Sequence, residues 1–287
     1  MDIYGGFTMR YRIIADSSCD LPSDFLEKDN IDFSIVPLTI TIDGKEFVDD
    51  DTLDMKAFLN AMRTGKTMTT ACPSPSVFAD EMKKNIHSVC VTISQNLSGT
   101  YNAAVQGTQI AREENEEIKA EVADSFLTSG GMVLMIMKLR QWIKEGLPYE
   151  EIVENVRAYQ KTICARFVLQ DLGNLVKAGR MGKVAGVFAS ALSLCPVCGD
   201  NGNGQIVVLE KVRGAKQALS HLVDTVAEKV KTVGKFPVVI SHVDNEEQAN
   251  LIKNMLFERY GLDDVMVLPA RGLVAFYAAY KGIVMCF

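Results

Sequence analysis

The stretch His87 to Ala104, HSVCVTISQNLSGTYNAA, decides the fold. An apolar run with β-strand character breaks at a polar turn, and a helix is predicted to begin at Ser98-Gly99-Thr100. A strand followed by a turn of small residues brings free backbone N–H groups, hydroxyls and the positive end of a helix dipole together. The stretch therefore predicts an anion site, and hydroxyl donors without a neighbouring cation suit a carboxylate better than a polyphosphate.

The same alternation of strand and helix continues on both sides of this stretch. It is typical of a parallel sheet covered by helices. Between the first two strands, the segment LTITIDGKEFV alternates about Asp43-Gly44, which predicts a small β-hairpin appendage. The predicted strands are Tyr11–Ala15, Ser88–Ile93 and Ala120–Ala123, and the predicted helices are Pro22–Lys28, Thr100–Glu114 and Gly131–Lys144.

A chain of 287 residues exceeds the usual size of one domain, so two are expected. Gly146-Leu147-Pro148 leads into a predicted helix, Tyr149–Gln160, and we place the boundary after it, between domains 1–160 and 161–287. The predicted fold is α/β, with a parallel-sheet N-terminal domain and an α/β or α+β C-terminal domain. In the second domain we expect strands at Ile163–Leu169, Gln205–Val212, Pro237–Ser241, Asp264–Leu268 and Gly282–Cys286, and helices at Ala215–Lys231 and Asn245–Tyr260.

Composition excludes several classes of function. The chain has 30 basic and 36 acidic residues and a formal charge of −6, and it holds no block of Lys or Arg, so nucleic acid is not an expected partner. Seven cysteines, mostly in apolar runs, indicate reduced thiols and a cytoplasmic protein. The first residues, MDIYGGFTM, do not resemble a signal peptide, and the apolar run Met132–Met137 is too short to span a bilayer. Stable membrane insertion is therefore not expected.

Three motifs that often carry chemistry are incomplete here. Gly65-Lys66-Thr67 ends like a Walker A loop, but Asn60 stands where that motif needs glycine, so no nucleotide site is predicted. Cys195 and Cys198 have the spacing of half a zinc site, but no second C-x-x-C or H-x-x-x-H exists, so no metal site is predicted. The triplet Asp49-Asp50-Asp51 is interpreted as a solvated loop.

The segment Thr69–Ser76, TTACPSPS, supports two interpretations. Ser74 and Pro75 are a typical N-cap and first residue of a helix, which predicts a simple helix entry. Alternatively, Thr70 supplies a second hydroxyl to the anion site of Ser98. Both residues lie at loop ends of the predicted parallel sheet, where open α/β folds bind ligands. The residues alone leave both interpretations open.

A set of short motifs, taken in order and spacing, resembles the DegV family, bacterial proteins that bind long-chain fatty acids. The resemblance extends across most of the chain, and the family's LSGTY motif occurs here without a change. The motifs are ADSSCDLP at Ala15–Pro22, TACPSP at Thr70–Pro75, LSGTY at Leu97–Tyr101, ADSFLTSGG at Ala123–Gly131, LVKAGRMG at Leu175–Gly182 and LEKVRG at Leu209–Gly214.

The resemblance implies a ligand-binding site between two lobes. In that picture the hydroxyls of Thr70 and Ser98 bind the carboxylate of a fatty acid such as palmitate, with the backbone of Gly99 and Thr100 nearby and the acyl chain in an apolar tunnel. Related members present the bound acid to a fatty acid kinase. The chain is then a carrier in lipid transport or fatty acid metabolism, not an enzyme, with no cofactor besides the fatty acid. Arg180 matches the family's Gly-Arg step and is a candidate partner contact.

The chain departs from the family near its C-terminus. Members often carry a His-x-Gly-Pro-Gly segment whose histidine reaches the head group, whereas the corresponding region here is ARGLVAFYAAYKG, Ala270–Gly282. It contains no histidine. Arg271 and Tyr277 are the candidate replacement donors, and an arginine would form the tighter, charge-assisted pair.

Two other classes of function remain open from the sequence. A serine hydrolase acting on acyl esters would use Ser98 as the nucleophile and His87, His221 or His242 as the base. The segment around Ser98 lacks the Gly-x-Ser-x-Gly elbow that commonly exposes such a serine. A small-molecule-sensing module without a lipid is the third possibility, and an empty, water-filled cleft between the lobes would favour it.

Overall fold

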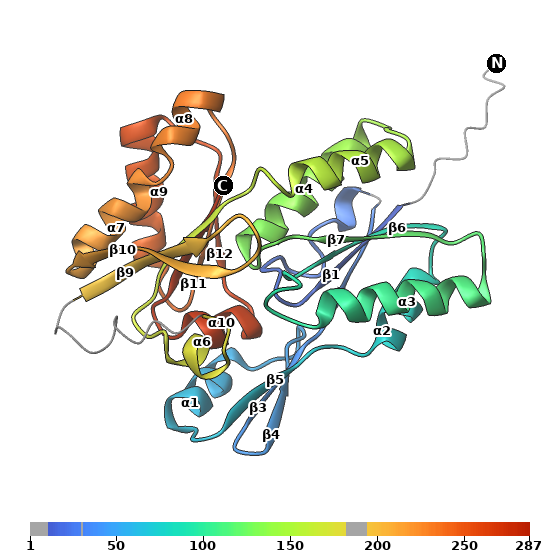
Figure 1. The fold of residues 1–287 in the computed structure, drawn as a ribbon, viewed down its shortest axis with the longest axis horizontal. Helices are drawn as coiled ribbons and strands as arrows, with labels where there is room; N and C mark the ends of the chain where they lie inside the picture. Colours follow the sequence, from blue (N-terminus) through green and yellow to red (C-terminus); the bar gives the residue numbers. More distant parts are fainter. Residues whose placement is uncertain (1–10, 30, 182–193) are drawn as a thin grey trace.

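The computed structural model describes residues 11–29, 31–181 and 194–287 (Figure 1). The first sheet is wholly parallel and has the order β2-β1-β6-β7. Its strands are β1 (Tyr11–Asp16), β2 (Asp32–Val36), β6 (His87–Thr92) and β7 (Lys119–Asp124). The three predicted strands are confirmed. Strand β2 was not predicted. It has only five residues, DFSIV, and four of its side chains are half-buried.

Helices cover both faces of this sheet. On one face lie α2 (Pro75–Met82) and α3 (Thr100–Glu114), and on the other lie α4 (Gly130–Lys144) and α5 (Tyr149–Tyr159). Strand β1 is therefore buried on both sides, with Ile14 packed among α2 and α3 and Ile13 in the larger core with α4. Helices α3 and α4 begin within one residue of their predicted starts.

A small antiparallel sheet, of order β4-β3-β5, lies below the first sheet in Figure 1. Strands β3 (Thr39–Ile42) and β4 (Lys45–Val48) form the predicted hairpin. Asp43 and Gly44 have φ angles of 49° and 81°, as a tight two-residue hairpin turn requires. The third strand, β5 (Met68–Ala71), and helix α1 (Met55–Thr64) complete this unit, and β5 was too short to be predicted.

The C-terminal half forms a mixed sheet of order β10-β9-β8-β13-β11-β12. All five predicted strands are confirmed, and β9 was not predicted. The strands are β8 (Ala165–Val168), β9 (Leu194–Asp200), β10 (Ile206–Arg213), β11 (Val238–His242), β12 (Val265–Pro269) and β13 (Ile283–Cys286). The helices are α6 (Gly173–Lys177), α7 (Ala215–Asp224), α8 (Ala227–Val233), α9 (Glu246–Tyr260) and α10 (Gly272–Ala278).

Two predicted helices differ from the structure. Pro22–Lys28 is a series of turns that ends in the short 3₁₀ helix η1 (Glu27–Asp29), since its backbone N–H groups bond three residues back and not four. The predicted helix Ala215–Lys231 is two helices, α7 and α8. The chain breaks at Thr225, whose hydroxyl donates to the carbonyl of Leu222 at 2.6 Å and competes with the helical ladder.

Helix α4 joins the two larger sheets. It packs on β1 and β6 of the first sheet and on β11 and β13 of the second. A Cβ atom on Gly130 would lie 2.9 Å from the side chain of Val239, so glycine permits this close contact. The fold is thus mixed α/β with two domains, as predicted, while the boundary between residues 160 and 161 stays a prediction. No helix among the described residues is long and apolar enough to cross a membrane.

Candidate ligand-binding cavity

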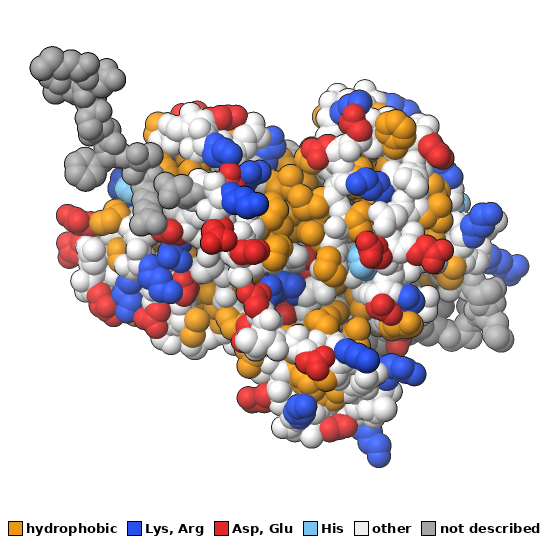
Figure 2. Space-filling model, turned by 180° about the vertical axis from the view of Figure 1, so that it is seen from behind, with side chains coloured by type: hydrophobic (Ala, Val, Ile, Leu, Met, Phe, Trp, Pro, Cys, Tyr) orange, Lys and Arg blue, Asp and Glu red, His pale blue; other side chains and the backbone are white. Residues whose placement is uncertain are grey.

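A cavity lies where the two larger sheets and α10 meet. Its empty space amounts to about 1110 Å³, the open mouth included. One side is formed by the loops that follow β5, β6 and β7, and the other by β8, β13 and α10. The cavity therefore adjoins the carboxyl ends of parallel strands, where open α/β folds place ligands. On the face shown in Figure 2, hydrophobic side chains gather along the junction between the lobes.

The walls of the cavity are mainly apolar. Ala165, Phe167 and Leu169 alternate along one face of β8 and its extension, and all three line the cavity. Val284 of β13 pairs with Phe167 and adds to the same wall. The remaining apolar lining is formed by Leu38, Ile93, Leu97, Phe126, Leu127, Leu175, Ile206, Leu273, Val274 and Ala278. Such a wall suits a long hydrocarbon chain.

Several residues with hydroxyl groups belong to this lining. The hydroxyls of Thr70 on β5 and Tyr277 on α10 lie 3.1 Å apart. Ser98 also lines the cavity, and its hydroxyl lies 2.8 Å from that of Thr100, which is fully buried at the start of α3. The sequence predicts neutral hydroxyl donors at Thr70 and Ser98. The structure places both in the lining and adds Tyr277.

The loop that carries Ser98 approaches the end of β5 closely. A Cβ atom on Gly99 would lie 3.6 Å from the sulfur of Cys72, and both residues line the cavity. Arg180 lies at the same place, because its Nε donates to the carbonyl of Leu97 at 2.8 Å. The guanidinium of Arg180 is exposed and also donates to the carbonyl of Ala178 at 2.6 Å.

A second hollow adjoins the cavity and shares Thr70, Arg180 and Tyr277 with it. Its lining adds the exposed cations Lys66 and Lys177. The hydroxyl end of the cavity therefore opens beside a basic surface, although the chain as a whole carries a formal charge of −6. A negative group at the mouth would meet a favourable potential there.

Two buried carboxylates shape the loops around the cavity without lining it themselves. Asp16, at the end of β1, accepts hydrogen bonds from the N–H groups of Ser18 and Ile93 at 2.9 and 2.7 Å. Desolvation raises the pKa of Asp16 to about 6, although these hydrogen bonds act to lower it. Asp124, at the end of β7, accepts from the N–H of Phe126 at 2.8 Å, and burial raises its pKa as well. Both carboxylates therefore act as turn caps.

Arg271 is the candidate residue that the structure places apart from the others. It does not belong to the described cavity lining. Its backbone N–H donates to Asp20 at 2.9 Å, and its guanidinium donates to Asp51 at 2.9 Å. The donor that meets Thr70 in the region without the family's histidine is therefore Tyr277. The sequence allowed either residue, and only the fold separates them.

The remaining candidate groups also lie away from the cavity. None of the three histidines belongs to its described lining: His87 packs against Tyr149, His221 bonds Glu210, and His242 accepts the N–H of residue 245. Cys195 and Cys198 lie three residues apart on the extended strand β9, so their side chains point to opposite faces and cannot share one ion. No metal-binding group of three side chains occurs in the described ranges.

These features define a class of protein: a two-domain α/β fold that encloses an apolar cavity with a hydroxyl-bearing, basic mouth. Residues 10–284 match the sequence pattern of the DegV family of uncharacterised proteins. The chain belongs to the DegV family. A DegV domain-containing protein of Streptococcus pneumoniae R6 is 35% identical over 283 residues, covering 96% of this chain and 98% of that protein.

Solved structures of similar proteins hold fatty acids. A DegV family protein from Ruminococcus gnavus, described with vaccenic acid, has a TM-score of 0.91 and 32% identity, covering 97% of this chain and 100% of that one. The fatty acid kinase (Fak) B3 protein of S. pneumoniae, loaded with linoleic acid, has a TM-score of 0.89 and 32% identity, covering 97% and 99%. A DegV family protein from Eubacterium eligens, loaded with heptadecanoic acid, has a TM-score of 0.88 and 32% identity, covering 96% and 98%.

Proposed function

We propose that this chain binds one long-chain fatty acid and carries it in the cytoplasm to a fatty acid kinase. The observation that carries the proposal is the cavity itself, which has a mainly apolar lining that includes the hydroxyls of Thr70, Ser98 and Tyr277 and adjoins a hollow lined by cations. The fatty acids in the similar structures support the same ligand class.

Burial of the acyl chain supplies most of the binding free energy. Each methylene removed from water contributes about 0.8 kcal/mol. The wall formed by β8, β13 and α10 offers hydrocarbon contacts along its length, and it holds few polar groups that would lose water on binding. Affinity should therefore rise with chain length until the cavity is full.

The carboxylate lies at the mouth and is fixed by hydrogen bonds. Thr70, Ser98 and Tyr277 donate from their hydroxyls, while Arg180 adds a positive charge at the same end. Tyr277 takes the part that a histidine plays in many family members. These contacts orient the acid more than they hold it, because each one replaces a hydrogen bond to water.

The partner reaches the acid from the basic side. Lys66, Lys177 and Arg180 surround the hollow that adjoins the carboxylate end, so a kinase with an acidic docking surface and a bound nucleoside triphosphate would meet complementary charge. In this role the chain presents its ligand and does not itself carry out the phosphoryl transfer. Its seven cysteines are free thiols, which agrees with a reducing compartment.

Titration calorimetry on delipidated protein tests the binding role against hydrolysis. Palmitate should bind saturably at one molecule per chain, and p-nitrophenyl palmitate should release no p-nitrophenol above the buffer rate. Adding a bacterial fatty acid kinase and ATP to the loaded protein should then yield an acyl phosphate. Absence of palmitate binding together with turnover of the ester would reverse the assignment to a hydrolase.

A further inference from the structure

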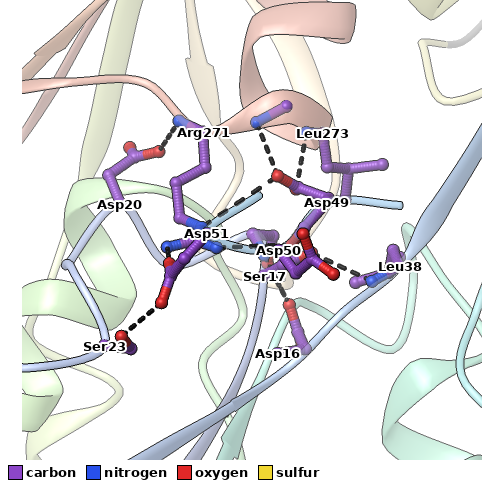
Figure 3. Close-up of polar contacts among 12 residues, drawn as sticks. Asp16, Ser17, Asp20, Ser23, Leu38, Asp49, Asp50, Asp51, Arg271 and Leu273 are labelled. Atoms are coloured by element: carbon purple, nitrogen blue, oxygen red, sulfur yellow. Dashed lines mark hydrogen bonds and ion pairs between the residues drawn. The ribbon is translucent and has the colours of Figure 1, made fainter. Parts of the chain in front are cut away.

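A buried carboxylate holds the start of the helix that carries Tyr277. Asp49 follows β4 directly, is 1% exposed, and accepts hydrogen bonds from the N–H groups of Gly272 and Leu273, both at 2.8 Å (Figure 3). These are the first two residues of α10, whose N–H groups have no partner within the helix. Hydrogen bonds to a carboxylate are strong, so this contact fixes the amino end of α10.

The same small sheet supplies Asp49 and Thr70. In the register of that sheet, Thr39 of β3 pairs with Val48 on one side and with Ala71 on the other. Asp49 is the residue after Val48, and Thr70 is the residue before Ala71. The backbone N–H of Asp49 also donates to the carbonyl of residue 38, at 2.9 Å, which ties the end of the hairpin to its own sheet. One rigid unit therefore carries both Thr70 and the carboxylate that holds α10.

The position of the first turn of α10 determines where Tyr277 lies in the cavity. Tyr277 lies five residues after Gly272, which in an α-helix corresponds to about 7.5 Å along the axis. Leu273 and Val274 line the cavity between them. In so short a helix, a displacement of the first turn moves the tyrosine with it, and the 3.1 Å contact with Thr70 depends on that placement.

The contact between Asp49 and the start of α10 requires glycine at position 272. A Cβ atom there would lie 2.7 Å from Oδ1 of Asp49 and 2.7 Å from the side chain of Leu53. Alanine would therefore push the carboxylate away from the helix. Burial raises the pKa of Asp49, and the hydrogen bond from Leu273 and the nearby guanidinium of Arg271 oppose that rise.

We propose that Asp49 is a positioning residue for fatty acid recognition: through α10 it sets where the Tyr277 hydroxyl meets Thr70, and so it determines the preference of the cavity for a carboxylate head group. This inference rests on the proposed function. It also corrects the interpretation of Asp49-Asp50-Asp51 as a solvated loop, since Asp49 is buried while its neighbour Asp51 faces solvent.

The test compares two ligands with the same hydrocarbon chain. For delipidated protein, the head-group preference is the dissociation constant of hexadecanol divided by that of palmitate. Asp49→Asn keeps one acceptor oxygen and loses the other, so the preference should fall about tenfold while hexadecanol binds as before. Tyr277→Phe should lower the preference as well. Because Asp49 acts through Tyr277, adding Asp49→Asn to Tyr277→Phe should change it no further.

Control variants separate positioning from folding. Asp51→Asn removes a carboxylate from the same loop. Within the described ranges the side chain of Asp51 accepts hydrogen bonds from Ser23 and Arg271 and none from the N–H groups of α10, so this variant should leave the preference unchanged. Gly272→Ala perturbs the same contact from the helix side and should reproduce Asp49→Asn. An unchanged preference in folded Asp49→Asn, or an equal fall in the Tyr277→Phe background, would refute the positioning role.

Two further outcomes are decisive. If Asp49→Asn and Gly272→Ala both fail to fold, the contact serves the fold and not recognition, and the inference is overturned. If the unaltered chain binds palmitate and hexadecanol equally well, no head-group preference exists for Asp49 to set, and the inference alone is overturned. If the unaltered chain binds neither ligand, the proposed function itself is refuted.

Discussion

Narrowing the cavity should change which fatty acids bind. Ala165 lies on the cavity face of β8, in register with Cys286 of β13, and its side chain is 7% exposed. Ala165→Leu adds three carbon atoms to that wall. An acyl chain that fills the cavity then loses room for about three methylenes, which at 0.8 kcal/mol each amounts to about 2.4 kcal/mol, or roughly sixtyfold in affinity.

The assay is displacement of a fluorescent fatty acid by laurate, myristate, palmitate and stearate. The longest acids should lose about sixtyfold, whereas laurate should bind nearly as before, so the optimum moves to a shorter chain. Val168→Ile is the matched control, because Val168 lies on the opposite face of the same strand and packs in the other core. Equal losses for all four acids, or none for any, would refute the burial of the chain along β8.

Three further predictions concern the head group, the thiol at the mouth and the buried carboxylates. The double variant Thr70→Val with Ser98→Ala should weaken palmitate binding by about 2 kcal/mol in the same displacement assay, and unchanged affinity would contradict the proposed head-group site. Saturating palmitate should slow alkylation of the exposed Cys72 by iodoacetamide, followed by peptide mass spectrometry; an unchanged rate would place the ligand elsewhere. Burial raises the pKa of Asp20 to about 6, so its folded form binds more protons than the unfolded chain and stability falls as pH rises from about 4 to 6. The melting temperature of Asp20→Asn relative to that of the unaltered chain should therefore rise as the pH is raised from 4.5 to 7. A difference in melting temperature that does not change with pH would contradict this sign.

The sequence predicted the elements whose structure depends on residues that are neighbours along the chain. The strand β6 and helix α3 follow from one apolar run and one turn of small residues, and the hairpin follows from Asp43-Gly44. Strand β2 has five residues and strand β5 has four, and runs this short are weak evidence for a strand. The break at Thr225 depends on one side-chain hydrogen bond, which helix periodicity does not reveal.

The residues of the candidate site were also predictable only in part. Ser98 was found because it follows a strand-like run and matches a family motif, and Thr70 because of its motif. The structure puts both in the cavity lining, but Thr70 lies within the antiparallel strand β5 and not at a loop end of the parallel sheet, which is where the sequence predicts it. The choice between Arg271 and Tyr277 could not be made from sequence, because it depends on how α10 sits on the small sheet. Asp49 was misjudged for the same reason: three consecutive aspartates suggest solvent, and only the tertiary contact with the start of α10 buries the first of them.

Native mass spectrometry of the protein as purified from bacteria tests the central claim most directly. Spectra before and after denaturing extraction, with lipid analysis of the extract, should show one long-chain fatty acid per folded chain and identify its length and unsaturation. A folded chain that carries no fatty acid, and that takes up none when palmitate is added after delipidation, would contradict the claim that this cavity binds fatty acids.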